Sequence, residues 1–422
     1  MAKDMKKVLD NVLEKISLTE EEISEINEEL EGFLSKIESN IKKFKIDVEI
    51  FVGGSYAKGT LIRKKTYDVD IFLRFNKRYS GKDYSKLSKK VLSGIKKMSV
   101  SHGSRDYFKA EINPKLFFEL VPVKRIKSPK EAENVTDLSY SHVKYVKNRI
   151  KNRKIIDGIK LAKAFCYATR TYGAESYIKG FSGYSLELLV YRFGSFEKFL
   201  KALSKDEDKK IIIDMEQHYK KGDVLLDMNG SKLDSPIILV DPTYKERNAL
   251  AGLSEETFAK FRKNALLFLK NPSEEFFDRK KINFSGLISK NKKNVVLIEL
   301  RTTKEEGDVA GTKLLKFFNH LTEETSKYFK ILGKDFEYNG DKTGKGYLIL
   351  KSRGEVVLTG PKIDDKDNLT KFKKEHKNIF IKNGRIYSRK KIDFQASQFI
   401  NKWSQKNKKK MKEMSISEIK VD

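Results

Sequence analysis

The sequence predicts an α+β protein of several domains: a head with a mixed sheet and helices, a helical central domain, and a C-terminal α+β body that ends in a basic tail. Three observations lead to this fold class. Short apolar strands separated by polar turns occupy the first third of the chain, long segments with helical periodicity follow, and strand patterns return after residue 290. We expect the domains at residues 1–145, 146–255, 256–380 and 381–422.

The head should begin with a helix and continue with three strands. Thr19 and Glu22 have the spacing of a capping box, and the apolar residues after them recur at steps of three and four, which is typical of a helix that packs on a core. Gly53-Gly54-Ser55 predicts a tight turn that opens a short helix. The predicted strands are 46–52, 68–75 and 116–123.

Helical periodicity dominates the central domain. We expect helices over 155–172, 184–203 and 254–269, and a short strand at 237–240. The polar stretch 204–235 should hold a helix and a loop. In the body, the predicted elements are strands at 295–300, 347–350 and 355–358 and a helix at 312–332.

The chain carries a formal net charge of +29. A surface this basic repels itself unless it meets a polyanion, so nucleic acid is the expected partner. The alternative is a lysine-rich composition that reflects genome bias or life at high temperature. No apolar run approaches the roughly 18 residues needed to span a bilayer, and the charged N-terminus is unlike a signal peptide. We therefore expect a cytoplasmic protein with no membrane partner.

The cysteine and histidine content limits the kind of metal site. Cys166 is the only cysteine, which excludes an internal disulfide and a thiolate cage, and the five histidines are not closely paired. A metal ion would therefore be held by carboxylates, which suit Mg²⁺ or Mn²⁺.

The strand DVDIFLRF is the most informative feature. Alternate side chains of a strand share a face, so Asp68 and Asp70 stand together while the apolar residues between them face a core. Adjacent carboxylates repel each other unless a cation lies between them, which indicates a divalent metal. The alternative is a solvated edge strand. Glu119, within an apolar strand, is the best candidate for a third carboxylate, and its alternative is an edge residue or an ion pair with a lysine.

The glycine turn before this strand has the features of a phosphate site. Glycines let the backbone approach a ligand, and amide groups at a helix start favour phosphate. Ser55 and Lys58 supply further donors, although the G-K-[ST] ending of a Walker loop is absent. Alone, such a turn would be structural. A phosphate turn followed by a metal-holding strand predicts nucleotide chemistry.

These motifs together resemble the DNA polymerase β-like nucleotidyltransferases. Further stretches resemble the archaeal, class I CCA-adding enzymes in particular, and the resemblance covers about residues 20–395. The stretches are DLSYSHVKYV (Asp137–Val146), YGAESYIKGFSGYSLELLV (Tyr172–Val190), YRFGSF (Tyr191–Phe196), DPTYKERNALAGLS (Asp241–Ser254) and TGPKIDD (Thr359–Asp365).

The resemblance implies a tRNA nucleotidyltransferase with a polymerase β-like head. Such an enzyme adds CCA to the 3′ end of tRNA from CTP and ATP without a template, releases pyrophosphate, and uses two metal ions, Mg²⁺ with Mn²⁺ as the alternative. Its catalytic, metal-binding residues would be Asp68, Asp70 and Glu119, the last of which replaces the usual aspartate. Its nucleotide-binding residues would be Gly54, Ser55, Lys58 (arginine in some members), His142, Lys163 and Tyr172 around the triphosphate and sugar, and Arg247 and Asn248 at the base.

Partners and alternatives complete the expectation. The tRNA would be held at its acceptor stem and 3′ end, and dimers are common in the family, so a homodimer is expected as an option. Residues 385–412 hold ten Lys or Arg with aromatic residues between them, and we expect this tail to contact RNA phosphates or another subunit. The alternatives are a poly(A) or terminal uridylyl transferase, a nucleotidyltransferase acting on a protein or small molecule, and an RNA-binding protein with a decayed site. Without the family, His142 would be a core histidine, Tyr172 a helix-end aromatic, and Lys163 and Arg247 ordinary surface cations.

Overall fold

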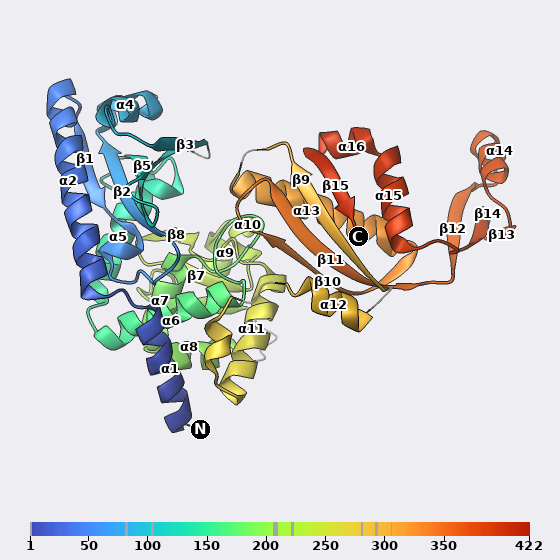
Figure 1. Cartoon of the computed structure of the whole chain (residues 1–422), viewed down its shortest axis with the longest axis horizontal. Coiled ribbons are helices and arrows are strands. Elements are labelled where there is room, and N and C mark those ends of the chain that lie inside the picture. Colours follow the sequence, from blue (N-terminus) through green and yellow to red (C-terminus); the bar gives the residue numbers. More distant parts are fainter. Residues whose placement is uncertain are drawn as a thin grey trace. The chain divides into compact units, whose positions relative to one another are not determined.

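The computed structural model describes residues 2–80, 83–102, 105–205, 210–220, 223–279, 282–291, 294–304 and 306–422. The chain divides into two compact units, residues 1–280 and 281–422. Each unit combines helices and sheets (Figure 1), which confirms the predicted fold class. The finer division into four domains stays a prediction.

A five-stranded sheet forms the centre of the head. Its strand order is β1-β2-β5-β4-β3, and it is mixed, because β2 and β5 run parallel while the other pairs are antiparallel. Helix α2 (Glu20–Phe44) lies along one face of it (Figure 1). The strands are β1 (Val48–Val52), β2 (Tyr67–Phe75), β3 (Met98–His102), β4 (Asp106–Glu111) and β5 (Leu116–Lys124).

The packing of α2 follows from its sequence. Thr19 and Glu22 form the predicted capping box, in which each side chain accepts from the backbone N–H of the other. The apolar stripe of α2 then meets the sheet, where Phe33 packs edge-to-face on Phe118 with 4.9 Å between ring centroids. The apolar residues of β2 are fully buried on this side, which leaves its aspartates on the opposite face, as predicted. They are Val69, Ile71, Leu73 and Phe75.

A second apolar core in the same unit is built mainly from helices. Phenylalanines from several helices meet around Phe165, which contacts Phe196, Phe261 and Phe268. The helix expected over 184–203 is two helices, because Gly194 adopts a left-handed φ of 83° that ends α7. The helices of this core are α1 (Ala2–Ile16), α5 (Ser139–Arg149), α6 (Arg153–Ala168), α7 (Gly183–Phe193), α8 (Phe196–Leu203) and α11 (Glu255–Lys270).

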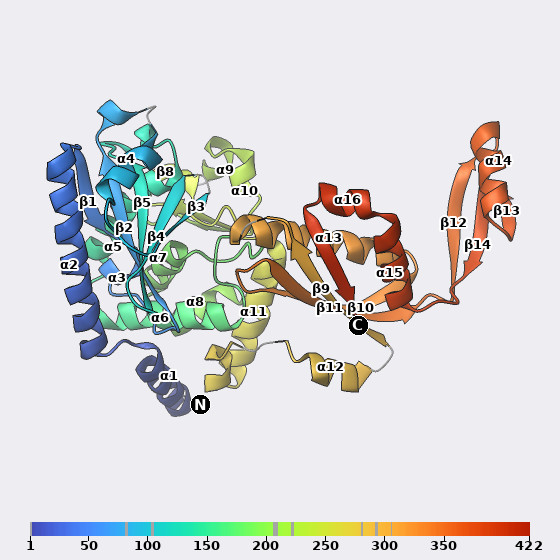
Figure 2. The ribbon, with the colours of Figure 1, turned by 45° about the horizontal axis from the view of Figure 1, so that its top comes forward.

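Shorter elements complete the first unit. Helix α3 (Gly54–Ala57) is the short helix predicted after the glycine turn, and it packs beside β2 and α5 (Figure 2). A three-stranded sheet has the order β6-β7-β8, of which only β7 was predicted. The remaining elements are α4 (Tyr84–Val91), β6 (Ile211–Ile213), α9 (Val224–Asp227), α10 (Gly230–Leu233), β7 (Ile237–Asp241), β8 (Tyr244–Asn248) and 3₁₀ turns at 77–79, 129–131, 135–138 and 274–277.

The second unit has two sheets. Helix α13 packs on an antiparallel sheet of order β10-β11-β9-β15, and α14 packs beside the sheet β12-β14-β13. The expected helix 312–332 ends at Ser326, because β10 begins at Phe329. The elements are α12 (Phe284–Asn291), β9 (Val295–Thr302), α13 (Asp308–Ser326), β10 (Phe329–Tyr338), β11 (Thr343–Ser352), β12 (Glu355–Lys362), α14 (Lys366–Glu375), β13 (Ile379–Lys382), β14 (Arg385–Lys391), α15 (Ala396–Lys406), α16 (Lys408–Glu413) and β15 (Ile416–Val421).

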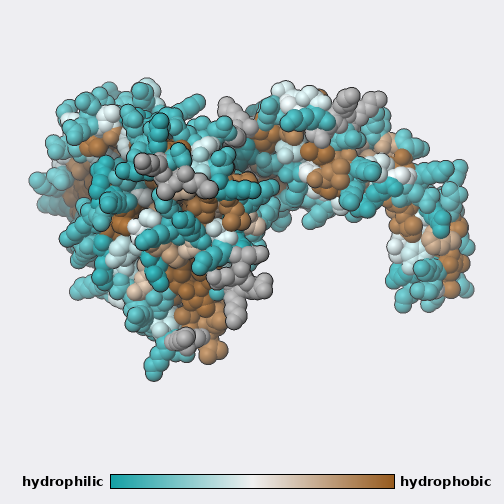
Figure 3. Space-filling view, turned by 90° about the horizontal axis from the view of Figure 1, so that it is seen from below, coloured by the Kyte–Doolittle hydropathy of each residue, from teal (hydrophilic) through white to brown (hydrophobic). Residues whose placement is uncertain are grey.

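The basic C-terminal segment is part of this unit. Strand β15 pairs with β9, and the ring of Trp403 packs on Phe317 with 6.1 Å between ring centroids. Hydrophilic residues predominate on the face of the protein seen in Figure 3, with apolar patches between them. Among the described helices, none is long and apolar enough to cross a membrane.

Candidate active site

The strand register places the three predicted carboxylates on one face of the head sheet. Asp70 on β2 lies directly opposite Glu119 on the parallel strand β5. Lys109 on β4 lies opposite Glu119 from the other side. Asp68 is two residues before Asp70 and therefore projects from the same face. The structure thus places on one face of the sheet all three acidic residues that the sequence predicts as metal ligands.

The buried acidic side chains are costly to keep in their charged form. Burial raises the pKa of Asp70 to about 6, and the charge of Asp68 adds to that rise. Burial likewise raises the pKa of Glu119 to about 7, with repulsion from Asp70 next in size. Asp68 is more exposed, and its Oδ1 lies 2.8 Å from Nζ of Lys109. The face therefore carries more negative charge than its own lysine balances.

The donor set fits a hard divalent cation. Among the residues that the structure describes, no three acidic, histidine or cysteine side chains lie close enough together to hold a metal ion. The oxygens of Asp70 and Glu119 are nevertheless the donors that Mg²⁺ and Mn²⁺ prefer. A cation between them would stabilise the charged forms of both carboxylates, whose pKa values are raised by burial first and by neighbouring carboxylates second.

The glycine turn lies against this acidic face. The backbone N–H of Gly53 donates to the carbonyl oxygen of Asp70 over 2.8 Å. Gly54 has a φ of +61°, and a Cβ there would lie 1.6 Å from Oδ2 of Asp70. Only glycine therefore lets the turn approach the carboxylate so closely. Ser55, the next residue, lies in the short helix α3, which begins at Gly54.

Two predicted lysines meet at a buried carboxylate that the sequence analysis did not select. Glu187 on α7 is completely buried. Its Oε2 lies 2.6 Å from Nζ of Lys58, and its Oε1 lies 2.8 Å from Nζ of Lys163. Lys163 and Glu187 both also bond the hydroxyl of Thr60. The signal that could have found Glu187 is the one that found Glu119, an acid inside an apolar run.

One carboxylate pairs with two ammonium groups here. This imbalance, together with burial, determines the pKa values of Lys163 and Glu187. Burial lowers the pKa of Lys163 to about 8, because Glu187 only partly offsets the burial and Lys58 adds repulsion. Burial alone would raise the pKa of Glu187, but Lys163 and Lys58 outweigh it and hold that pKa at about 2. The cluster therefore keeps a surplus positive charge beside the glycine turn.

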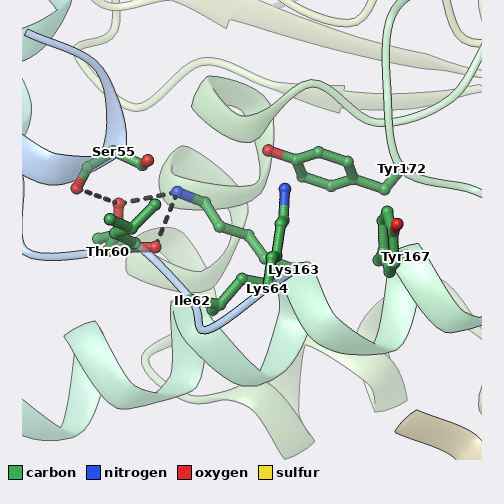
Figure 4. Close-up of a pocket in the computed structure, with 8 residues that line it drawn as sticks. Ser55, Thr60, Ile62, Lys64, Lys163, Tyr167 and Tyr172 are labelled. Atoms are coloured by element: carbon green, nitrogen blue, oxygen red, sulfur yellow. Dashed lines mark hydrogen bonds between the residues drawn. The ribbon is translucent and has the colours of Figure 1, made fainter. Parts of the chain in front are cut away.

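A pocket opens next to this cluster (Figure 4). The ammonium of Lys163 points toward Thr60, while the ammonium of Lys64 points toward the ring of Tyr172. Lys64 lies 5.3 Å from the ring centroid of Tyr167 and 5.6 Å from that of Tyr172. The pocket is lined by Ser55, Thr60, Leu61, Ile62, Lys64, Lys163, Tyr167 and Tyr172.

His142 and Arg247 meet at a second buried carboxylate, Asp241. Its Oδ2 lies 2.9 Å from Nε2 of His142 and 2.7 Å from Nη1 of Arg247. Its Oδ1 accepts from the Tyr184 hydroxyl at 3.1 Å, and the Tyr184 ring stacks on His142. Burial lowers the pKa of His142, while Asp241 opposes that shift. Asp241 was part of a quoted motif, but no role was predicted for it.

Asn248 is occupied by the backbone around it. Its Oδ1 accepts from the N–H groups of Leu239 and Leu250. Its Nδ2 donates to the carbonyls of Lys232 and Ile237. The amide thus braces the β7–β8 hairpin that carries Arg247. Its predicted contact with a nucleotide stays a prediction.

Comparison with known proteins gives two domain families in succession. Residues 34–157 match the family described as a nucleotidyltransferase domain, and residues 157–278 match the second domain of tRNA nucleotidyltransferase.

Relatives match over most of the chain. The CCA-adding enzyme of Nanoarchaeum equitans is 35% identical over 348 residues, which are 81% of this chain and 83% of the relative. That of Methanococcus maripaludis is 27% identical over 394 residues, covering 90% and 86%. Among solved structures, a complex of the Cid1 poly(U) polymerase with MgATP has a TM-score of 0.51 at 12% identity, and covers 66% of this chain and all of that one. At this level of identity, the similarity concerns the fold alone.

Proposed function

This chain belongs to the archaeal-type family of CCA-adding enzymes, and we propose that it adds C, C and A to the 3′ end of tRNA. The nucleotides come from CTP and ATP without a template, and pyrophosphate is released. The observation that carries the proposal is the pairing of Asp70 and Glu119 across β2 and β5 beside the glycine turn. That face combines acidic oxygens with a backbone able to approach phosphate closely.

Asp68, Asp70 and Glu119 would hold two Mg²⁺ ions, with Mn²⁺ as the alternative. When bound, the ions would lower the pKa of the RNA 3′-hydroxyl and neutralise charge on the triphosphate and the departing pyrophosphate. Glutamate at position 119 supplies the same oxygens as the usual aspartate on a longer side chain. The carboxylates fix where the reacting groups meet, which is the main protein contribution in phosphoryl transfer.

The pocket beside the turn would bind the triphosphate. Ser55 and the backbone at Gly54 would donate to phosphate oxygens. Lys163 and Lys58 would supply positive charge, and Glu187 holds both at the rim of the site. Tyr172, which lines the same pocket, would lie beside the triphosphate. The surplus charge of the lysine cluster favours a polyanionic ligand.

Base selection would depend on Arg247, which shares the carboxylate of Asp241 with His142. Asp241 takes one guanidinium nitrogen of Arg247, which fixes the side chain and leaves other N–H donors for a base. Cytosine and adenine present acceptors at their pairing-edge ring nitrogens, where uracil and guanine present donors. A fixed arginine would therefore accept CTP and ATP and reject the other two nucleotides.

The RNA would be held through its phosphates. The +29 charge of the chain suits the acceptor stem of a tRNA, because A-form RNA is recognised largely through backbone and shape. Association of two chains is a further part of the proposal that the family suggests.

Incubating the purified protein with Mg²⁺, each labelled nucleoside triphosphate and tRNA lacking CCA tests this function. We expect two C additions from CTP alone and a single terminal A once ATP is added. Long homopolymer tails would indicate a poly(A) or uridylyl transferase instead. Binding of tRNA without any incorporation would indicate an RNA-binding protein with a decayed site.

A further inference from the structure

The pocket beside the glycine turn contains a lysine to which no role has yet been given. Lys64 lies on the segment between α3 and β2, and its ammonium points into the pocket lined by Ser55 and Lys163 (Figure 4). The side chain is exposed, so it can move. Within the described part of the chain, no carboxylate lies in salt-bridge contact with it.

The other two lysines of the site are differently placed. Lys58 and Lys163 are buried, and Glu187 holds both of them at 2.6 and 2.8 Å. Their charge is therefore shared with a carboxylate. Lys64 offers its full charge, and this charge is close enough to lower the pKa of Lys163. Among the three lysines, Lys64 is the one that an incoming anion meets without first competing with an acid.

The aromatic contacts of Lys64 are weak enough to be exchanged. Its ammonium lies 5.3 Å and 5.6 Å from the ring centroids of Tyr167 and Tyr172. A cation over a ring at an exposed site is a weaker contact than a charge-assisted hydrogen bond to phosphate. The two rings thus place the flexible side chain at the pocket, and their contacts are weak enough to be replaced by contacts with phosphate.

From this arrangement we propose that Lys64 binds the triphosphate of the incoming nucleotide at the end away from the base. The inference rests on the proposed function, because it takes the pocket for the triphosphate site. Lys64 closes over the phosphates from the side opposite the Lys58–Lys163–Glu187 cluster. It contributes to nucleotide affinity and has no part in choosing between CTP and ATP, since both carry the same triphosphate.

The test compares Lys64→Gln with Lys65→Gln. Lys65 is the next residue, also exposed, and does not line the pocket, so its substitution controls for a general loss of charge. We expect Lys64→Gln to raise KM for CTP and for ATP by about tenfold, the value of one charge-assisted hydrogen bond. The KM for tRNA should stay the same, inhibition by inorganic pyrophosphate should weaken by a similar factor, and Lys64→Arg should restore affinity.

Two results would overturn the assignment. One is an unchanged KM for both nucleotides, or the same increase in Lys65→Gln. The other is a raised KM for tRNA with normal nucleotide binding, which would place Lys64 on the RNA. Calorimetric titration of CTP into wild type and Lys64→Gln needs no turnover, so it tests Lys64 even if the wild type adds no CCA. Failure of the proposed function is therefore distinguishable from failure of this inference.

Discussion

Replacing Glu187 with glutamine removes the negative charge that two buried lysines share. The Nζ atoms of Lys58 and Lys163 lie 2.6 and 2.8 Å from its carboxylate oxygens, and their side chains are 8% and 4% exposed. Glutamine has the same size and keeps one acceptor. The variant therefore isolates the charge of Glu187 and leaves the packing of α7 in place.

Removing one partner of a buried ion pair costs about 3–5 kcal/mol, because the other charge stays buried and uncompensated. The folded variant can reduce this cost if Lys163 releases its proton. Relative to wild type, the release costs about 1.4 kcal/mol at pH 7, because the wild-type pKa of about 8 lies one unit above that pH and one unit is worth 1.36 kcal/mol. This figure bounds the part of the loss that comes from Lys163. Lys58 loses the same partner, so we expect a total loss of about 3 kcal/mol, at the lower end of the range, and a fall in Tm on the order of 10 °C.

Proton release from Lys163 makes the loss of folding stability depend on pH. Without Glu187, the folded pKa of Lys163 falls below its wild-type value of about 8. Just below pH 8, the unfolded state then binds a proton that the folded variant lacks, so the stability of the variant rises with pH. The wild type changes much less between pH 6.5 and about pH 7.5, because its Lys163 is still mostly protonated in both states below the folded pKa of about 8. The difference should shrink by up to about 1.4 kcal/mol per pH unit as the pH rises to 8.

Thermal and urea unfolding at pH 6.5 and pH 8 measures both effects. Glu38→Gln is the matched control, since Glu38 is an exposed helical residue of the same unit. Glu187→Asp, which keeps the charge, should be less destabilised than Glu187→Gln. A Tm within about 2 °C of wild type, or a deficit of equal size at both pH values, would refute the view that Glu187 balances the lysines.

Four further predictions concern Lys163, Arg247, the exposed lysines of α16 and the C-terminal segment. Because Lys163 loses its charge above pH 8, CTP affinity by calorimetry should fall as the pH rises through that value, and Lys163→Arg should remove the fall; an unchanged profile would count against a phosphate role. Arg247→Ala should reduce discrimination of CTP over UTP by about 10- to 100-fold in single-nucleotide incorporation, and unaltered selectivity would exclude it from base reading. Changing Lys408 and Lys409, exposed on α16, to glutamine should weaken tRNA binding and flatten its salt dependence while CTP affinity stays constant; equal salt slopes would place the RNA elsewhere. Truncation after Asn383 should unfold the second unit, measurable as lost thermal stability, because it removes β15, which pairs with β9.

Local sequence patterns predicted the parts of the fold in which the spacing of residue types determines the backbone geometry. The alternation in DVDIFLRF gave both the buried face of β2 and the placement of Asp68 and Asp70. The capping box at Thr19 located the start of α2. In these places the side-chain period and the backbone geometry are coupled directly.

The misses have physical reasons as well. Strands β3 and β4, MSVSH and DYFKAE, lie at one side of the sheet, and each is short with at least half of its residues polar, so few apolar residues mark it as a strand. The helix expected over 184–203 contains Gly194, whose positive φ divides the segment into two helices. The partners of Glu187 lie 129 and 24 residues away along the chain, and pairings over such distances depend on tertiary packing that no local pattern records. For that reason the acidic face was predictable and the buried ion cluster beside it was not.

The rate of CMP incorporation into tRNA lacking CCA by Asp70→Asn tests the central claim most directly. The variant keeps the size and hydrogen-bonding shape of the side chain that faces Glu119 and removes its charge. We predict a rate at least about 10³-fold lower than wild type, equal to about 4 kcal/mol of lost transition-state stabilisation, with unchanged tRNA binding and thermal stability. Turnover near the wild-type rate would contradict the assignment of this carboxylate face as the catalytic centre.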